Sequence, residues 1–187
     1  MQKKSQEKLE LNYSDDVIDI VKFGSSVLEG NIPNDIDIAV IFKKITLKQQ
    51  LEESQKIKKQ LELFFDKPIH IKSYDLYSLF DKGNFARESI LFYGKSLLSG
   101  NYFSESMGLI SRVHIFYSLT KLKKKDKVRF NYLLNGKKGK YGLLRENQGR
   151  LLSPGLIEIL PEHEKIFSDA MKEITSNFEI KKVFLSK

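Results

Sequence analysis

The chain has 187 residues, a formal net charge of +8 and no cysteine, with 41% hydrophobic and 30% charged residues. This length allows one domain or a main domain with a small appendage, and the hydrophobic content suits a buried core rather than a disordered chain. The absence of cysteine excludes disulfide frameworks, thiolate metal sites and cysteine nucleophiles.

The first elements expected along the chain are a short polar helix and two strands. Residues 5–12 favour the helix, and Val17–Phe23 (VIDIVKF) is β-branched and apolar, which predicts a strand that ends at Gly24. Asp35–Phe42 (DIDIAVIF) alternates acidic and apolar residues before it becomes fully apolar. This pattern predicts a second strand with a carboxylate face at its beginning.

A long helix and a third strand are expected next. Thr46 is a suitable N-cap for a helix that extends to about Phe65, which is long enough for a crossover connection. The segment Ile69–Tyr74 alternates again, so His70 and Lys72 share one face of the third strand.

A domain boundary is expected near Asn101. Before it, residues 85–92 favour a helix and residues 94–99 a short strand or extended link, which completes a first domain of residues 1–100. Residues 101–187 are expected to form a basic helical module with one or two strands. Its expected elements are helices at 107–122 and 127–134, a turn rich in Gly and Lys, a short element from Leu143, a strand at 156–160, a helix at 161–177 and a final strand at 178–185.

No segment of the sequence has the character of a membrane span. The N-terminal residues MQKKSQEKLELNYSDD are polar, and no run of about 18 apolar residues occurs. We therefore expect no membrane partner and a cytoplasmic location.

The positive charge is concentrated in one segment, Arg112–Arg150. It contains twelve Lys or Arg and two acidic residues, so its local net charge of +10 exceeds that of the whole chain. Tyrosines and phenylalanines are interleaved with the basic residues, a mixture suited to gripping phosphates and stacking on bases. This pattern indicates a nucleic-acid partner, and the alternative is a solvated lysine-rich surface. The candidate contact residues are Lys121, Lys123, Lys124, Lys125, Lys127, Arg129, Lys137, Lys138 and Lys140.

The segment FGSSVLEGNIPNDIDIAVIF, residues 23–42, combines a strand, a Gly-Ser turn and two aspartates. Asp35 and Asp37 are two residues apart, so on a strand their carboxylates point to the same side. Adjacent carboxylates repel each other unless a cation lies between them, and their hard oxygen ligands suit Mg²⁺ or Mn²⁺. The turn offers backbone N–H groups from Gly24 and hydroxyl groups from Ser25 and Ser26, which predicts a seat for a triphosphate.

This stretch resembles the signature of the DNA polymerase β-like nucleotidyltransferase superfamily, and most of all its minimal, prokaryotic-type members. Gly24, Ser25, Asp35 and Asp37 match the signature, and the resemblance covers roughly residues 17–100. It implies an α+β fold with a small mixed sheet and flanking helices. It also implies that the two aspartates bind metal, that the Gly-Ser turn holds a nucleoside triphosphate, and that an NMP moves to a hydroxyl with loss of pyrophosphate.

The expected third strand departs from that superfamily's pattern. A third carboxylate that faces the first two is usual there, whereas this strand reads Ile-His-Ile-Lys-Ser-Tyr. His70 is therefore a candidate base or metal ligand, or the mark of a degenerate site. Lys72 is a candidate phosphate contact, or a lysine that only reaches solvent.

Two hypotheses about function follow. The first is a Mg²⁺- or Mn²⁺-dependent nucleotidyltransferase that acts on a hydroxyl of RNA or a tRNA-like molecule, of DNA, or of a protein. A protein acceptor is included because minimal members of the superfamily include antitoxins that modify a tyrosine of a partner toxin. The second is a catalytically degenerate protein on the same scaffold that serves as a nucleic-acid-binding or antitoxin-like regulatory module.

Overall fold

The computed structural model describes residues 9–187 and shows two compact units. Of the described residues, 9–27 and 31–108 form unit 1, and Leu28–Gly30 and Leu109–Lys187 form unit 2. The chain therefore passes from one unit to the other three times, and Asn101 lies within the range of unit 1. The expected helix at 5–12 falls partly outside the described residues, and its described part, Leu9–Asn12, is not helical.

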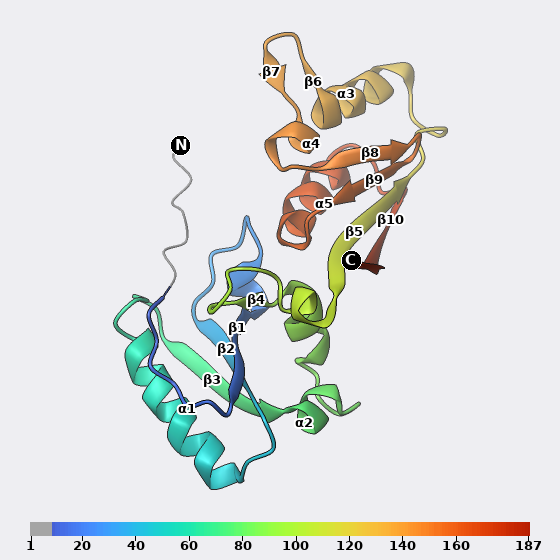
Figure 1. Ribbon diagram of the computed structural model, residues 1–187. Helices are drawn as coiled ribbons and strands as arrows, with labels where there is room; N and C mark the ends of the chain where they lie inside the picture. Colours follow the sequence, from blue (N-terminus) through green and yellow to red (C-terminus); the bar gives the residue numbers. More distant parts are fainter. Residues whose placement is uncertain (1–8) are drawn as a thin grey trace. The chain divides into compact units, whose positions relative to one another are not determined.

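Unit 1 is built on a four-stranded mixed sheet (Figure 1). Its strands are β1 (Val17–Phe23), β2 (Ile36–Phe42), β3 (Ile69–Asp75) and β4 (Lys95–Ser96), in the order β3-β2-β1-β4. Strands β2 and β3 run parallel, and β1 is antiparallel to both β2 and β4. The strands expected from alternation are present, and the α+β class is confirmed.

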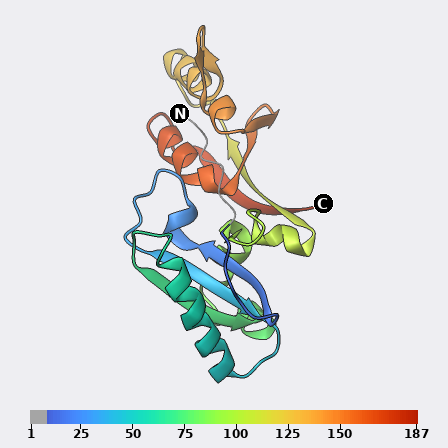
Figure 2. The same cartoon turned by 60° about the vertical axis from the view of Figure 1, so that its left-hand side comes forward.

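The crossover between the parallel strands is made by α1 (Leu47–Leu61), which lies along one face of the sheet (Figures 1 and 2). Thr46 caps its N-terminus in a capping box with Gln49, as expected. The helix ends at the buried Leu61 rather than near Phe65. This side packs on a core that includes Ile20, Ile38 and Val40 of the sheet, among others.

The other face of the sheet is covered by short helical segments. These are α2 (Leu76–Phe80), a π-helical turn η2 (Ser89–Tyr93) and a 3₁₀ segment η3 (Phe103–Met107). Their core contains Val21, Phe23, Ala39, Ile41, Leu79, Ile90 and Phe103. The expected helix at 85–92 is therefore shorter and shifted, and α2 was not expected.

Unit 2 is also built on a four-stranded sheet, which is antiparallel throughout. The strands are β5 (Leu109–Tyr117), β8 (Arg150–Ser153), β9 (Leu156–Ile159) and β10 (Phe178–Ser186), in the order β10-β5-β9-β8. The expected helix at 107–122 is wrong. Residues of β5 alternate between more and less buried positions with a period of two, which suits a strand that packs one face on a core.

The remaining elements of unit 2 are short. They are α3 (Lys124–Asn135), the hairpin of β6 (Gly136–Lys137) and β7 (Lys140–Tyr141), α4 (Leu143–Glu146), the 3₁₀ turn η4 (Pro161–His163) and α5 (Glu164–Lys172). The expectation of a helical module with one or two strands is thus corrected, since a sheet forms the frame of unit 2. None of the helices within residues 9–187 is long and apolar enough to cross a membrane.

Glu158 ties the three strands β5, β9 and β8 together. Its buried carboxylate lies 3.0 Å from His114 Nε2 and accepts a 2.7 Å hydrogen bond from Arg150 Nε, and Arg112 Nε lies 3.8 Å away. Burial alone would raise the pKa of Glu158. The hydrogen bonds and positive charges of His114 and Arg150 outweigh it, and the pKa is lowered.

Leu28–Gly30, the three-residue part of unit 2 that interrupts unit 1, is fixed by Glu29. The Glu29 N–H donates a 2.9 Å hydrogen bond to Glu162 O. The Glu29 carboxylate lies 3.2 Å from Nδ1 of the buried His163.

Candidate functional site

The register of three neighbouring strands determines where the candidate site lies in unit 1. Asp37, the second residue of β2, pairs with Phe23 of β1 on one side and with His70 of β3 on the other. Asp37 alternates with Ala39 and Ile41, which belong to the core beneath the short helical segments. The site therefore lies on that face of the sheet, opposite α1.

Asp35, Asp37 and His70 form a cluster that could hold a cation. One possible ligand atom from each lies within 4.8 Å of the others, and His70 Nδ1 is 3.3 Å from Asp35 Oδ2. Among residues 9–187 no further acidic side chain or histidine joins this group. Two carboxylates and an imidazole at this spacing fit a divalent cation, with the carboxylates favouring Mg²⁺ or Mn²⁺.

The pKa of Asp37 is raised by its surroundings, including the neighbouring carboxylate. Burial raises the pKa of Asp37, and the neighbouring charge of Asp35 raises it further. His70 and Lys72 act in the opposite direction without cancelling the rise. Burial also raises the pKa of the Tyr74 hydroxyl, with a contribution from Asp37. A cation between the two aspartates would relieve this repulsion.

Gly24 begins the 3₁₀ turn η1 (Gly24–Val27) and lies directly against Asp37. Its φ is +73°, and a Cβ at this position would lie 2.3 Å from Asp37 Oδ2. The absence of a side chain is thus required both by the backbone conformation and by the aspartate. The Gly24 N–H donates a 3.2 Å hydrogen bond to Ser89 Oγ of η2.

The two serines of the turn differ in their surroundings. The Ser26 hydroxyl donates a 3.0 Å hydrogen bond to Phe23 O, so it helps to fix the turn. Ser25 is exposed, and its carbonyl accepts a hydrogen bond from the Asn31 side chain. Of the two, Ser25 is better placed to offer its hydroxyl to a ligand.

Lys72 lies on the same face of β3 as His70, two positions further along the strand. It pairs in register with Ala39, is exposed, and is not a member of the cluster. Its influence on the site is the effect of its charge on Asp37.

Ser89 and Tyr74 are site neighbours that the sequence did not reveal. Ser89 is 65 residues from Gly24 in the chain, and it reaches the turn only because η2 packs beneath β1. Tyr74 continues the alternation of His70 and Lys72, so its face could have been inferred from the strand pattern.

The expected nucleic-acid contacts lie on and around α3 and the β6–β7 hairpin of unit 2. All nine are exposed, and we call them the basic surface: Lys121, Lys123, Lys124, Lys125, Lys127, Arg129, Lys137, Lys138 and Lys140. Two exposed tyrosines, Tyr132 and Tyr141, lie among them. Lys137 Nζ is 5.6 Å from the ring centre of Tyr132, and the Arg145 guanidinium is 3.9 Å from the ring centre of Tyr141. Arg129 is partly engaged, since it lies 3.6 Å from Glu173.

Comparison of the chain with models of protein families, with curated proteins and with solved structures finds no match.

Proposed function

We propose that this protein is a nucleotidyltransferase that depends on Mg²⁺ or Mn²⁺. In the proposed reaction, an acceptor hydroxyl oxygen attacks the α-phosphorus of a nucleoside triphosphate, the bond from that phosphorus to the bridging oxygen breaks, and pyrophosphate leaves. The observation that carries the proposal is the cluster of Asp35, Asp37 and His70 beside the turn at Gly24.

The residues of unit 1 have distinct roles in this proposal. Asp35 and Asp37 would hold the cation, which would neutralise charge on the triphosphate and polarise the phosphoryl group. The turn of Gly24 and Ser25 would receive the phosphates beside the Asp37 carboxylate, which occupies the space that a Gly24 side chain would fill. His70, whose side chain is 61% exposed, would accept the proton of the attacking hydroxyl or complete the cation site.

The basic surface supports a nucleic acid, RNA or DNA, as the acceptor. Its charges would contact phosphates, and Tyr132 and Tyr141 are exposed for stacking on unpaired bases. A protein hydroxyl is the alternative acceptor, and the transfer experiment below distinguishes the two.

The proposal is tested by nucleotide binding and by transfer of a label. The melting temperature is measured with each of the four nucleoside triphosphates, with Mg²⁺ or with chelator, and transfer is followed with α-labelled nucleotide and RNA, DNA or protein from a lysate. Nucleotide at a hundredfold excess over its Kd should stabilise the fold by about 2.7 kcal/mol. Asp35→Asn and Asp37→Asn should each abolish the Mg²⁺-dependent stabilisation and the transfer.

Asp66→Asn is the matched control, because Asp66 is an exposed aspartate of unit 1 outside the cluster. This variant should behave as the parent protein does. Transfer that survives in both cluster variants would overturn the proposal.

A second candidate, a binding module without catalysis, is favoured by the position of His70. It pairs with Asp37 on the strand where the resemblance leads us to expect a third carboxylate. Such a protein would be stabilised by nucleotide with Mg²⁺ yet transfer no label to any acceptor. Gain of transfer in His70→Asp would then show that this position alone had ended catalysis.

A further inference from the structure

Ser89 reaches the turn at Gly24 from a distant part of unit 1. Its Oγ accepts a 3.2 Å hydrogen bond from the Gly24 N–H. The sequence pattern predicts that this N–H is available to a phosphate, whereas the structure shows it paired with Ser89. A phosphate at the turn would therefore find a different donor in place of the Gly24 N–H.

The Ser89 hydroxyl has a proton to offer in that place. A serine hydroxyl carries one donor and two acceptor lone pairs. The bond from the Gly24 N–H uses a lone pair, and no group within residues 9–187 accepts the Ser89 proton. Ser89 is only partly buried. Its proton is therefore available to water or to a bound ligand.

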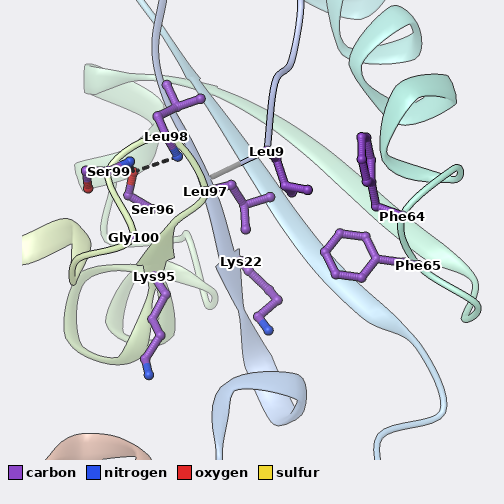
Figure 3. A pocket seen from close by; sticks show the side chains of 10 residues that line it. All are labelled: Leu9, Lys22, Phe64, Phe65, Lys95, Ser96, Leu97, Leu98, Ser99 and Gly100. Atoms are coloured by element: carbon purple, nitrogen blue, oxygen red, sulfur yellow. Dashed lines mark hydrogen bonds between the residues drawn. The ribbon is translucent and has the colours of Figure 1, made fainter. Parts of the chain in front are cut away.

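Ser96 is the contrasting case of a serine that has no donor left. It belongs to the loop that lines a pocket of about 440 Å³ in unit 1 (Figure 3). Its Oγ donates a 2.7 Å hydrogen bond to the buried Asp19 and accepts the N–H groups of Leu98 and Ser99. The donor and both lone pairs of Ser96 are used within the protein, whereas Ser89 retains its donor.

The π-helical turn η2 fixes the position of Ser89. Ile90, the next residue, is fully buried in the core that also contains Phe23 of β1. Gly94 follows η2 so close to β1 that a Cβ there would lie 2.6 Å from Val21 Cγ1. Because η2 is packed on β1, Ser89 Oγ is in place before a ligand arrives, which lowers the entropic cost of binding. Turns of this kind are rare and are frequent at functional sites.

Gly24 contacts both Ser89 and the Asp35 cluster. Asp37 Oδ2 occupies the space that a Cβ of Gly24 would fill. A triphosphate bound to a cation at Asp37 would bring ionised oxygens to this turn. A hydrogen bond to an ionised group is about twice as strong as one between neutral groups. The bond from Gly24 adds to it, since hydrogen bonds in a chain polarise one another.

We propose that Ser89 is a phosphate contact of the candidate transfer site. Its hydroxyl accepts the Gly24 N–H and donates its proton to a phosphate oxygen of the bound triphosphate. This inference rests on the proposed function, because it requires a triphosphate at the turn of Gly24 and Ser25.

Calorimetric titration of the full chain with inorganic tripolyphosphate and Mg²⁺ tests the inference independently of the base. We expect Ser89→Ala to weaken tripolyphosphate binding about tenfold, because one charge-assisted hydrogen bond is lost. Ser89→Thr keeps a hydroxyl and should restore the affinity. Ser106→Ala is the matched control, since Ser106 Oγ also bonds to the backbone, at 2.7 Å from Phe103 O, in the short segment η3. It should leave tripolyphosphate binding unchanged.

Binding of Mn²⁺ alone distinguishes a phosphate contact from a role in shaping the turn. If Ser89 only held the turn, its loss would shift Gly24 and the Asp37 carboxylate against it, and the affinity for the cation would fall. We expect Ser89→Ala to bind Mn²⁺ as the parent protein does in the absence of phosphate, as measured by electron paramagnetic resonance. The melting temperature without ligand verifies that each variant is folded.

Two results would overturn this inference alone. They are equal binding of tripolyphosphate by the parent protein and Ser89→Ala, and a loss of affinity in Ser89→Ala that is as large for Mn²⁺ alone as for tripolyphosphate. Both leave the proposed function standing. If the parent protein binds neither tripolyphosphate nor any nucleoside triphosphate, the proposed function fails and this inference fails with it.

Discussion

Gly24 and Asp37 approach each other more closely than two residues with side chains could. Asp37 Oδ2 occupies the space where a Cβ of Gly24 would lie, so the turn and the carboxylate are fitted to each other. Because the nearest atom is the end of a side chain, a methyl group at residue 24 would displace the carboxylate rather than the backbone. Its effect should therefore be larger on cation binding than on folding.

Gly24→Ala and Gly108→Ala separate these two effects. Both glycines have positive φ, +73° and +71°, but a Cβ at Gly108 would meet nothing within 4 Å. Each variant should lose about 1–2 kcal/mol of unfolding free energy in urea titrations, because an L-residue is strained at such φ values. Only Gly24→Ala should also lose Mg²⁺-dependent nucleotide binding. Equal nucleotide binding by the two variants would show that Gly24 has no part in the site.

At the residue scale, spacing alone predicted that Asp35 and Asp37 would share a face, and alternation placed His70 on the matching face of the next strand. The structure brings these three together. Ser89 could not be predicted, since its hydrogen bond to Gly24 depends on how a π-helical turn packs far along the chain.

At the scale of elements, the sequence was informative where hydrophobic alternation was regular. The strands β1 and β10 and the capped start of α1 were predicted because alternation and a capping residue are local signals. The apolar run around β5 was mistaken for a helix, because its strand character depends on pairing with β9 and β10 from much later in the chain. Pairing with distant strands, rather than local preference, determines the secondary structure of that segment.

Glu158 provides a test of how the sheet of unit 2 is held together. Glu158→Gln should lower the unfolding free energy at pH 7 by about 1–3 kcal/mol, because Arg150, Arg112 and His114 would lose the negative charge of the buried carboxylate. The pKa of Glu158 is lowered in the folded state. Its stabilisation is therefore complete above the ordinary glutamate pKa of about 4.3 and is lost as pH falls through the lowered value.

Urea unfolding at pH 7 and at about pH 3 measures this difference. The difference in unfolding free energy between Glu158→Gln and the parent protein should be smaller at the lower pH. Glu179→Gln, an exposed glutamate on β10, should change stability by less than about 1 kcal/mol at either pH. A difference that stayed constant with pH would mean that the charge of the Glu158 carboxylate does not contribute to stability.

At the scale of the whole molecule, the charge is divided unevenly between the two units. The segment from Arg112 to Arg150 has a net charge of +10, while the chain as a whole has +8. An acceptor that binds through phosphates should therefore depend on unit 2 and weaken as salt increases.

Charge reversal tests whether the basic surface binds nucleic acid, as proposed. The triple variant Lys123→Glu, Lys124→Glu and Lys125→Glu should weaken binding of single-stranded RNA and flatten the slope of log K against log salt by about 2, since each lost phosphate contact contributes about 0.7. Fluorescence anisotropy at several salt concentrations measures both effects.

The matched control is Lys44→Glu, Lys59→Glu and Lys82→Glu, which reverses three exposed lysines of unit 1 and gives the same net charge. If the two triple variants bind RNA equally, the basic surface is only a solvated face of the protein.

Because of the three residues Leu28–Gly30, the chain crosses between the two units three times, whereas a single linker would cross once. The chain enters unit 2 immediately after the turn of Ser25 and Ser26 and returns to unit 1 shortly before Asp35. Truncation at one point cannot separate the units, because cuts would be needed on both sides of these residues as well as after Gly108. Binding to unit 2 that changed the contacts of Glu29 would act on the segment between Ser26 and Asp35. If unit 1 binds a nucleotide and unit 2 an acceptor, as proposed, thermodynamic linkage requires each ligand to change the affinity for the other by the same factor.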